Sequence, residues 1–169
     1  MDRSTETIFI GQLAAAGGSR TLVVHGLGSC VALILFSRSA AVGGLAHVLL
    51  PGPQPESDTS LDLPAKYGPS AISALMARLS EMGAKPRDLR AILVGGARMF
   101  ASEMDLELGV GTRNVDSLRT SLAALRIPLA MELTGGDQGR TVAFDLPECA
   151  LRVRTLKEGW TSYPLGSTP

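Results

Sequence analysis

The first third of the chain carries short apolar runs that are broken by glycine and polar residues. This pattern predicts strands over residues 8–13, 21–24, 31–36 and 41–50. The last two runs are separated by the polar turn Ser37-Arg38-Ser39, which is typical of a hairpin. This part of the chain is therefore expected to be β-rich.

The apolar pattern changes to helical spacing after residues 51–60, whose prolines and small polar residues predict an exposed loop. The first predicted helix has Gly83 placed to end it, and its apolar positions are Ile72, Leu75, Met76, Leu79 and Met82. A second helix has Pro128 just past its end and Thr112 or Asn114 available as a cap. Its apolar positions are Val115, Leu118, Leu122 and Leu125.

Further strands are predicted between and after these helices. Residues 89–94 read as a buried strand that runs into Gly95-Gly96, and strands over 129–133, 141–145 and 150–156 close the chain. The last two form a hairpin around Leu146-Pro147-Glu148. Strands and helices are mixed without strict alternation, which favours an α+β layered sandwich over a doubly wound parallel sheet. A chain of 169 residues is expected to form a single domain, residues 1–169.

Charge and terminal sequence narrow the class of protein. Acidic and basic residues number 16 each, so no global field is expected to draw in nucleic acid or an anionic membrane. The N-terminus is charged and lacks the apolar run of a signal peptide, and later apolar runs are too short to span a bilayer. We therefore expect a soluble cytoplasmic protein without membrane insertion, in which Cys30 and Cys149 are free thiols.

The segment Gly26-Leu-Gly-Ser-Cys30 places a cysteine directly after small residues, at the start of an apolar strand. Small residues there let a substrate approach the sulfur, and backbone N–H groups around Ser29 and Cys30 could hold an oxyanion. His47 strengthens this interpretation. A tight hairpin turning at Arg38-Ser39 would place Cys30 directly opposite His47, with Cβ atoms roughly 4.5–5.5 Å apart.

Two alternatives to this pairing remain open. A bulge at Gly43-Gly44 would shift the register by one residue and turn His47 to the other face of the sheet. A cysteine in an apolar strand is also more often a small core residue, and a backbone carbonyl could satisfy the imidazole.

The remaining histidine, the remaining cysteine and the glycine pairs indicate no catalytic, nucleotide-binding or metal site. His25 is expected in an exposed loop, and Cys149 is expected to be structural in a hairpin turn. The pairs Gly95-Gly96 and Gly135-Gly136 lack the residues of a P-loop or the spacing of a dinucleotide fingerprint. With two cysteines and two histidines, no spacing favours a metal site.

Several motifs together resemble the chemoreceptor glutamine deamidase family, CheD. They occur in family order over about residues 6–156, which leaves 157–169 as an expected C-terminal tail. The matching blocks are Gly26-Leu-Gly-Ser-Cys-Val-Ala32, Gly43-Gly-Leu-Ala-His-Val-Leu-Leu-Pro51, Lys66-Tyr67, Gly95-Gly-Ala-Arg-Met-Phe100, Gly111-Thr-Arg-Asn114 and Gly135-Gly-Asp-Gln-Gly-Arg140 with Thr141-Val-Ala-Phe-Asp145.

The resemblance implies a three-layer α/β/β sandwich related to the catalytic domain of deamidating toxins of the cytotoxic necrotising factor type. It implies hydrolysis of selected glutamines on the cytoplasmic helices of chemoreceptors, without a cofactor, and the phosphatase CheC as a partner in organisms that have one. The family's nucleophile and base fall on Cys30 and His47. The third catalytic position of the family, a threonine, is Val24 here, whose backbone carbonyl remains available to orient the imidazole.

The residues alone leave the reaction open. The same thiol and imidazole pair could support a cysteine peptidase or a transglutaminase-like reaction. A rival from another class is a non-catalytic adaptor that binds receptors or a CheC-type phosphatase, and Val24 favours this rival slightly.

Overall fold

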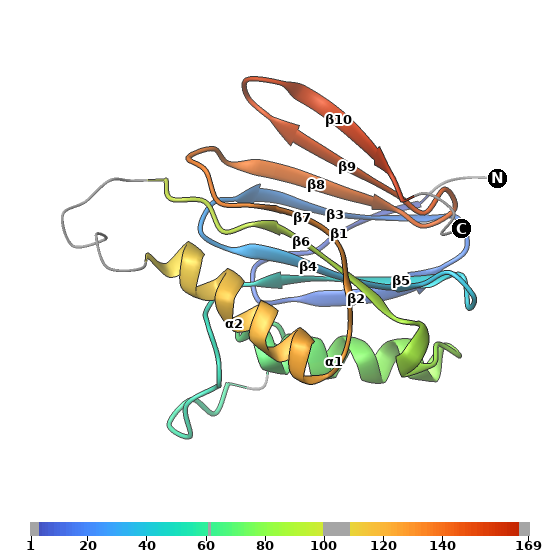
Figure 1. Cartoon of the computed structure of the whole chain (residues 1–169), viewed down its shortest axis with the longest axis horizontal. Coiled ribbons are helices and arrows are strands. Elements are labelled where there is room, and N and C mark those ends of the chain that lie inside the picture. Colours follow the sequence, from blue (N-terminus) through green and yellow to red (C-terminus); the bar gives the residue numbers. More distant parts are fainter. Residues whose placement is uncertain (1–3, 61, 100–108, 166–169) are drawn as a thin grey trace.

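Two stacked β-sheets and two helices make up the fold, as the computed structural model of the chain shows (Figure 1). The structure describes residues 4–60, 62–99 and 109–165. Phe100, which closes one of the sequence motifs, and the last four residues of the expected tail lie outside the described residues. The α+β class predicted from the mixed pattern of strands and helices is confirmed.

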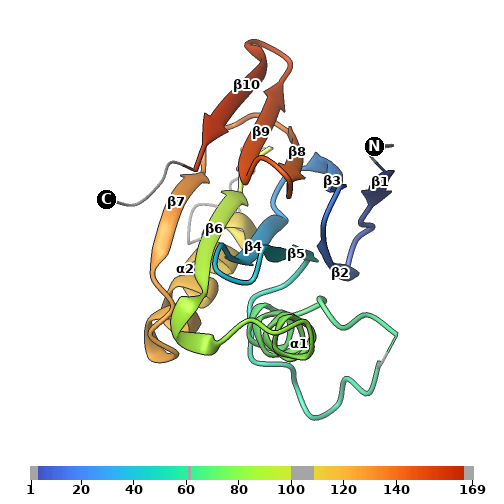
Figure 2. The ribbon, with the colours of Figure 1, turned by 90° about the vertical axis from the view of Figure 1, so that its right-hand side faces the viewer.

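The inner sheet lies between the helices and the other sheet (Figure 2). Its strand order is β2-β5-β4-β6-β7, and only the β6–β7 pair is parallel. The strands are β2 (Leu13–Gly17), β5 (Val42–Val48), β4 (Val31–Ser37), β6 (Arg90–Gly95) and β7 (Leu129–Thr134).

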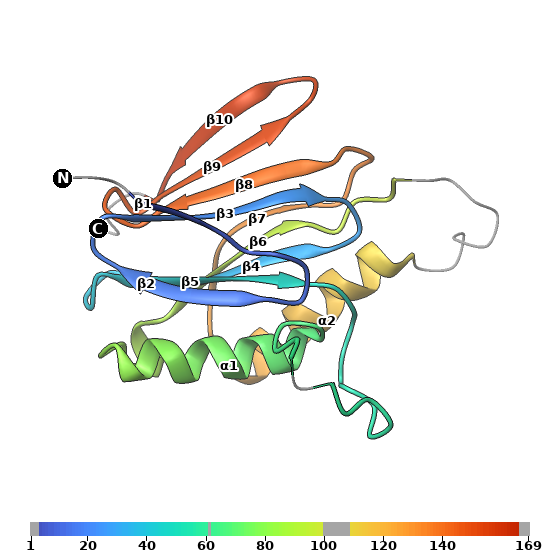
Figure 3. The same ribbon diagram turned by 180° about the vertical axis from the view of Figure 1, so that it is seen from behind.

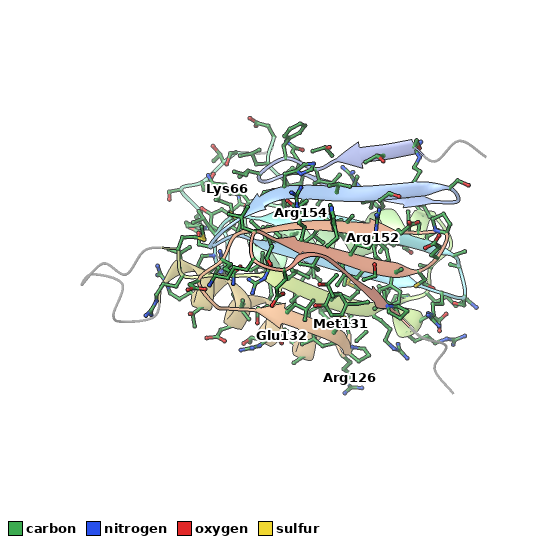
Figure 4. All side chains as sticks on the ribbon, turned by 90° about the horizontal axis from the view of Figure 1, so that it is seen from above. Lys66, Arg126, Met131, Glu132, Arg152 and Arg154 are labelled. Atoms are coloured by element: carbon green, nitrogen blue, oxygen red, sulfur yellow. The ribbon has the colours of Figure 1, made fainter. Side chains whose placement is uncertain are left out.

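The outer sheet has the order β1-β3-β8-β9-β10, with β1 parallel to β3. Its strands are β1 (Ser4–Thr7), β3 (Arg20–Leu27), β8 (Arg140–Asp145), β9 (Ala150–Thr155) and β10 (Gly159–Pro164). Arg152 and Arg154 are exposed on the outer face, which Figure 4 views from above, whereas Leu151 and Val153, which alternate with them, are buried. This alternation is expected of a sheet with one solvated face.

Both helices cover the free face of the inner sheet (Figures 1 and 3). Helix α1 (Gly68–Glu81) buries an apolar stripe and ends before Gly83, whose φ of 93° suits glycine. Helix α2 (Val110–Ala124) buries Val115, Leu118 and Leu122, and a 3₁₀ turn, Pro86–Asp88, precedes β6. The layers therefore follow the order helices, sheet, sheet.

Strand β4 is the centre of this arrangement, and all seven of its residues are buried. Val31, Leu33 and Leu35 belong to the core under the helices. Alternate residues, including Ala32, Ile34 and Phe36, belong to the core between the sheets. Because both faces of the strand are covered, the sequence reads as a continuous apolar run.

The strand predicted over residues 8–13 is wrong. This segment is where the chain crosses from the outer sheet to the inner sheet: the N–H of Ile8 donates to Val23 O of β3, and the N–H of Gly11 donates to His47 O of β5. Phe9 and Ile10 between them are exposed. Strands β1 and β2 flank the crossing, because a segment that changes sheets cannot pair along its whole length.

Two other predictions are corrected at element ends. Helix α2 begins at Val110, after Gly109, without a side-chain cap, so Thr112 and Asn114 lie inside the helix. The segment after residue 156 was expected to be a tail, but Gly159–Pro164 forms β10 and pairs with β9. Partly buried and exposed positions alternate in β10, which is an edge strand of the outer sheet.

Asp58 is the centre of a group of hydrogen bonds in the loop that follows β5. Asp58 accepts hydrogen bonds from the hydroxyl and N–H of Ser60, from Tyr67 OH at 2.8 Å and from Lys66 Nζ at 2.5 Å. These hydrogen bonds hold the pKa of Asp58 well below its usual range, and the bond from Lys66 has the largest effect. The backbone carbonyl of Lys66 then accepts the N–H of Leu50 at 2.8 Å. The loop is thus tied to the residues that follow β5.

Glycines in β5 allow the layers to approach the inner sheet from both sides. A Cβ added at Gly43 would lie 2.6 Å from a ring carbon of Phe144 in the outer sheet. A Cβ added at Gly44 would lie 2.6 Å from a methyl carbon of Leu75 in α1 and 3.0 Å from Ala14 O. Close packing on opposite faces therefore requires the glycine pair.

We expect Gly44→Ala to lower the free energy of unfolding by about 1–3 kcal/mol, because the added methyl group overpacks the core between β5 and α1. Urea denaturation measures the change. Gly139→Ala is the matched control, since a Cβ there meets its nearest atom, Leu27 O, at 3.6 Å. The control should change the free energy by less than about 1 kcal/mol. Equal effects of the two variants would contradict the packing argument.

Candidate active site

The register of the β4–β5 hairpin differs from the one predicted. His47 lies opposite Ala32, and the last pair before the turn is Ser37 with Val42. The turn is therefore longer than the expected tight turn and spans residues 38–41, closed by a hydrogen bond from Ala41 N to Arg38 O at 3.1 Å. Cys30 and His47 are not directly opposite each other, so that prediction is wrong. The alternative of a bulge is also excluded, because pairing is continuous through Gly43 and Gly44.

The difference in register amounts to two residues, so it preserves the face on which each side chain lies. Cys30 precedes Ala32 by two residues and shares its face of the inner sheet, in the core between the sheets. His47, opposite Ala32, is diagonal to Cys30. In an ideal ladder such diagonal positions are about 7–8 Å apart. Neighbouring strands thus bring the thiol and the imidazole to one face of the sheet.

The turn that carries Cys30 is fastened to the end of β6. The N–H of Gly96 donates to Cys30 O at 2.8 Å, and the N–H of Ala97 donates to Gly28 O at 2.9 Å. A Cβ at Gly95 would lie 2.4 Å from Cys30 O, so only glycine permits this approach. The pair Gly95-Gly96, examined in the sequence as a phosphate loop, instead provides a close backbone contact beside Cys30.

A pocket of ≈ 370 Å³ opens at Cys30. One wall is the turn itself, with Gly26, Gly28 and Ser29, and the facing wall is the first turn of α2 with the residue before it. The remaining residues that line the pocket are Ala97, Arg98 and Met99. The N–H groups in the first turn of a helix lack partners within the helix, and the helix dipole favours negative charge there. The pocket can therefore stabilise an anion beside the sulfur.

Burial favours the neutral form of the Cys30 thiol. The residue is 9% exposed, and desolvation raises its pKa, while its own backbone N–H acts in the opposite direction. Among the described residues, no backbone carbonyl accepts that N–H. It remains available to a substrate oxygen in the pocket.

Burial likewise favours the neutral form of His47, which is 2% exposed. Desolvation lowers its pKa, and the nearby backbone of Ile8 opposes this only in part. Within the described part of the chain, neither ring nitrogen has a hydrogen-bond partner, so the imidazole is not bonded to Cys30. The backbone of His47 is fixed by hydrogen bonds with Gly11 and Gln12. The resting pair is therefore a neutral thiol and a neutral imidazole.

Val24 and Ser29 are the other predicted site residues. Val24 is fully buried in β3, opposite Val142, and belongs to the same core as Cys30. Ser29 lines the pocket. Cys149 lies in the β8–β9 hairpin, at the opposite end of β4 from Cys30, and its carbonyl accepts the N–H of Leu165. His25 is exposed, as expected, but it lies within β3 and not in a loop.

Sequence reasoning missed the role of Asn114. Its amide donates to Ser29 O at 3.0 Å and to Leu49 O at 3.1 Å, and the residue is fully buried. The signal was present in the sequence. Asn114, Leu118 and Leu122 are spaced by four residues, so the asparagine continues the buried stripe of α2.

The fold and the pocket define an α+β protein with a buried thiol at the mouth of a helix-lined pocket. The family model described as CheD chemotactic sensory transduction matches residues 49–155. Cys30 and His47 precede this matched span. The chain belongs to the CheD family.

Curated relatives are similar over most of the chain. The chemoreceptor glutamine deamidase CheD of Bacillus licheniformis is 41% identical over 81% of this chain and 82% of its own. The protein of the same name from Bacillus subtilis is 37% identical over 82% and 84%. That of Thermotoga maritima is 37% identical over 91% and 94%.

Two solved structures overlap this chain in part. A protein of Neisseria meningitidis described by the family model DUF152 has a TM-score of 0.42 at 14% identity, over 73% of this chain and 53% of its own. The hypothetical protein YfiH of Bacillus licheniformis has a TM-score of 0.41 at 12% identity, over 79% and 60%. Overlap this limited indicates neither a shared fold nor a shared activity.

Among the described residues, no helix has both the length and the apolar character needed to cross a membrane.

We expect the alkylation rate of Cys30 to keep rising with pH beyond the ordinary thiol pKa, because burial raises the pKa and only the thiolate reacts. Iodoacetamide labelling of a Cys149→Ser variant, followed by intact mass across pH, measures this rate. A cysteine-containing unstructured peptide is the control. A Cys30 rate that levels off at lower pH than that of the peptide would contradict the neutral resting thiol.

Proposed function

We propose that this protein is a deamidase that hydrolyses glutamine side chains of chemoreceptors, with Cys30 as nucleophile and His47 as general base. One observation carries the proposal. In a chain of the CheD family, the hairpin register brings a thiol and an imidazole to one face of the sheet, beside a pocket with a helix N-terminus. The curated names of the relatives supply the substrate class.

The reaction begins when His47 takes the proton from Cys30 and the sulfur attacks the glutamine carboxamide carbon. The tetrahedral intermediate collapses as the histidine returns that proton to nitrogen, and ammonia leaves. His47 then takes a proton from water, which attacks the thioester and leaves glutamate. The proton returns to the sulfur, so the enzyme ends in its neutral starting state and needs no cofactor.

Backbone groups would stabilise the oxyanion of the intermediate. The N–H of Cys30 has no backbone carbonyl partner among the described residues, and the first turn of α2 lines the same pocket. Removing one oxyanion donor costs about a hundredfold or more in rate. Ser29, next to the sulfur, would help to orient the substrate.

A glutamine in this pocket must reach Cys30 from a protein surface. The substrate would be the cytoplasmic helices of chemoreceptors, and we place the reaction in the cytoplasm, where the two free cysteines stay reduced. A CheC-type phosphatase would be a regulatory partner where the organism has one. The family resemblance also supports a relationship to the catalytic domain of toxins of the cytotoxic necrotising factor type.

We expect wild-type protein to add about 1 Da to a receptor cytoplasmic domain for each glutamine converted to glutamate, and Cys30→Ala to abolish the gain because the nucleophile is removed. Intact mass and peptide mapping measure the conversion. Cys149→Ser is the matched control and should retain activity. A mass gain with Cys30→Ala would refute the assignment of the nucleophile.

We expect Val24→Thr to raise the deamidation rate, because the hydroxyl would give an unpaired His47 nitrogen a partner that orients the ring. Steady-state kinetics and urea denaturation of the variant measure both effects. If the hydroxyl finds no partner, the free energy of unfolding should fall by about 1–3 kcal/mol with no gain in rate. That outcome would place Val24 outside the catalytic arrangement.

A further inference from the structure

We propose that Asn114 is a positioning residue that clamps the turn carrying Cys30 to the end of the strand carrying His47. The proposal rests on the proposed function, in which these two side chains must meet at the substrate. Asn114 does not line the pocket, so it acts on the reaction only through the residues that it holds.

The clamp joins two neighbouring strands from a third element. The amide nitrogen of Asn114, in α2, donates to Ser29 O at 3.0 Å and to Leu49 O at 3.1 Å. Ser29 directly precedes Cys30, and Leu49 follows His47 by two residues. Both acceptors are carbonyl oxygens, so only the NH₂ group can face them, and the orientation of the amide is determined.

The clamp begins where the β4–β5 ladder ends. Val31 and Val48 form the last pair of the two strands, so Cys30 and Leu49 lie just beyond the ladder. Backbone pairing therefore does not hold Cys30 to β5. Instead, the side chain of Asn114 holds the two segments together, with one amide hydrogen donated to Ser29 O and the other to Leu49 O.

The burial of Asn114 indicates that this position is occupied by asparagine for the two hydrogen bonds that its amide nitrogen donates, and not for packing. Asn114 is fully buried, and among the described residues its Oδ1 has no hydrogen-bond partner. The next positions on this stripe of α2, Leu118 and Leu122, are apolar and pack in the core. An unpaired buried acceptor opposes folding, so an apolar residue would suit the helix better if packing were the only requirement.

Loss of the clamp should act on Cys30 in a specific direction. Without it, the Ser29 carbonyl is released, and the turn can move away from β5 and toward solvent. The thiol then becomes more exposed, and its pKa falls toward the ordinary value because desolvation decreases. The distance to His47 grows, so deamidation slows although the thiol itself is more reactive.

The experiment compares Asn114→Ala with Leu122→Ala, a matched truncation on the same stripe, eight residues farther along α2 and without a side-chain hydrogen bond. Each variant is made in the Cys149→Ser background. Deamidation of receptor domains gives kcat and KM, iodoacetamide labelling across pH gives the reactivity of Cys30, and thermal unfolding gives stability.

We expect Asn114→Ala to lower kcat by at least about tenfold, because misplacement of a reacting group is costly, with KM changed by less than about twofold. Labelling of Cys30 should become faster at neutral pH. Leu122→Ala should lose stability while keeping the wild-type kcat and labelling profile. If Asn114→Ala matches Leu122→Ala in both readouts, the clamp is overturned.

Two further comparisons keep the test decisive. If Asn114→Ala is unfolded, Asn114→Thr, which keeps the volume and one donor, takes its place and should show a smaller loss of kcat in the same direction. An unchanged kcat and labelling profile in this variant would overturn the clamp. If the wild-type protein deamidates no receptor, the proposed function fails, and the labelling comparison still decides the role of Asn114.

Discussion

The whole arrangement depends on burying both faces of β4. This strand has a neighbour on each side in the inner sheet, helices on one face and the outer sheet on the other. Its position leaves no freedom of register, because a shift by one residue would exchange the side chains that face the helices with those that face the outer sheet. The register of β5 beside β4 is therefore fixed, and the hydrogen bonds of Asn114 join the turn before β4 to the end of β5. A thiol and an imidazole placed on these two segments inherit that precision.

Much of the fold could be predicted from the hydrophobic pattern. Both helices and the strands from β4 to β9 are regular elements with a strong period or a continuous apolar run, and those signals are local. The segment over residues 8–12 could not be interpreted in this way, because its apolar residues serve a crossing between two sheets. Phe9 and Ile10 look like strand residues, yet they are exposed. β10 was missed because its alternation is weak and short.

The arrangement of the candidate site residues could be predicted only in part, because the neighbouring strands were recognised but their register was not. Sequence placed Cys30 and His47 on adjacent strands, and the structure agrees. The directly opposite pairing was wrong because turn length is set by backbone conformation, here with Ala41 at a φ of 53°, which its residue type does not reveal. Asn114 was read as a helix cap because asparagine often caps helices, whereas its partners are far away in sequence. Contacts of that kind become visible only when the layers are assembled.

The burial of the neutral Cys30 thiol affects how readily oxidants damage this protein. Peroxides attack thiolates that solvent can reach, and oxidation proceeds from sulfenic acid to irreversible products. Cys30 is largely covered, and its burial raises the pKa of the thiol and so favours the protonated sulfur. In the proposed reaction the sulfur loses its proton only during turnover, so the idle protein would present a poor target to an oxidant.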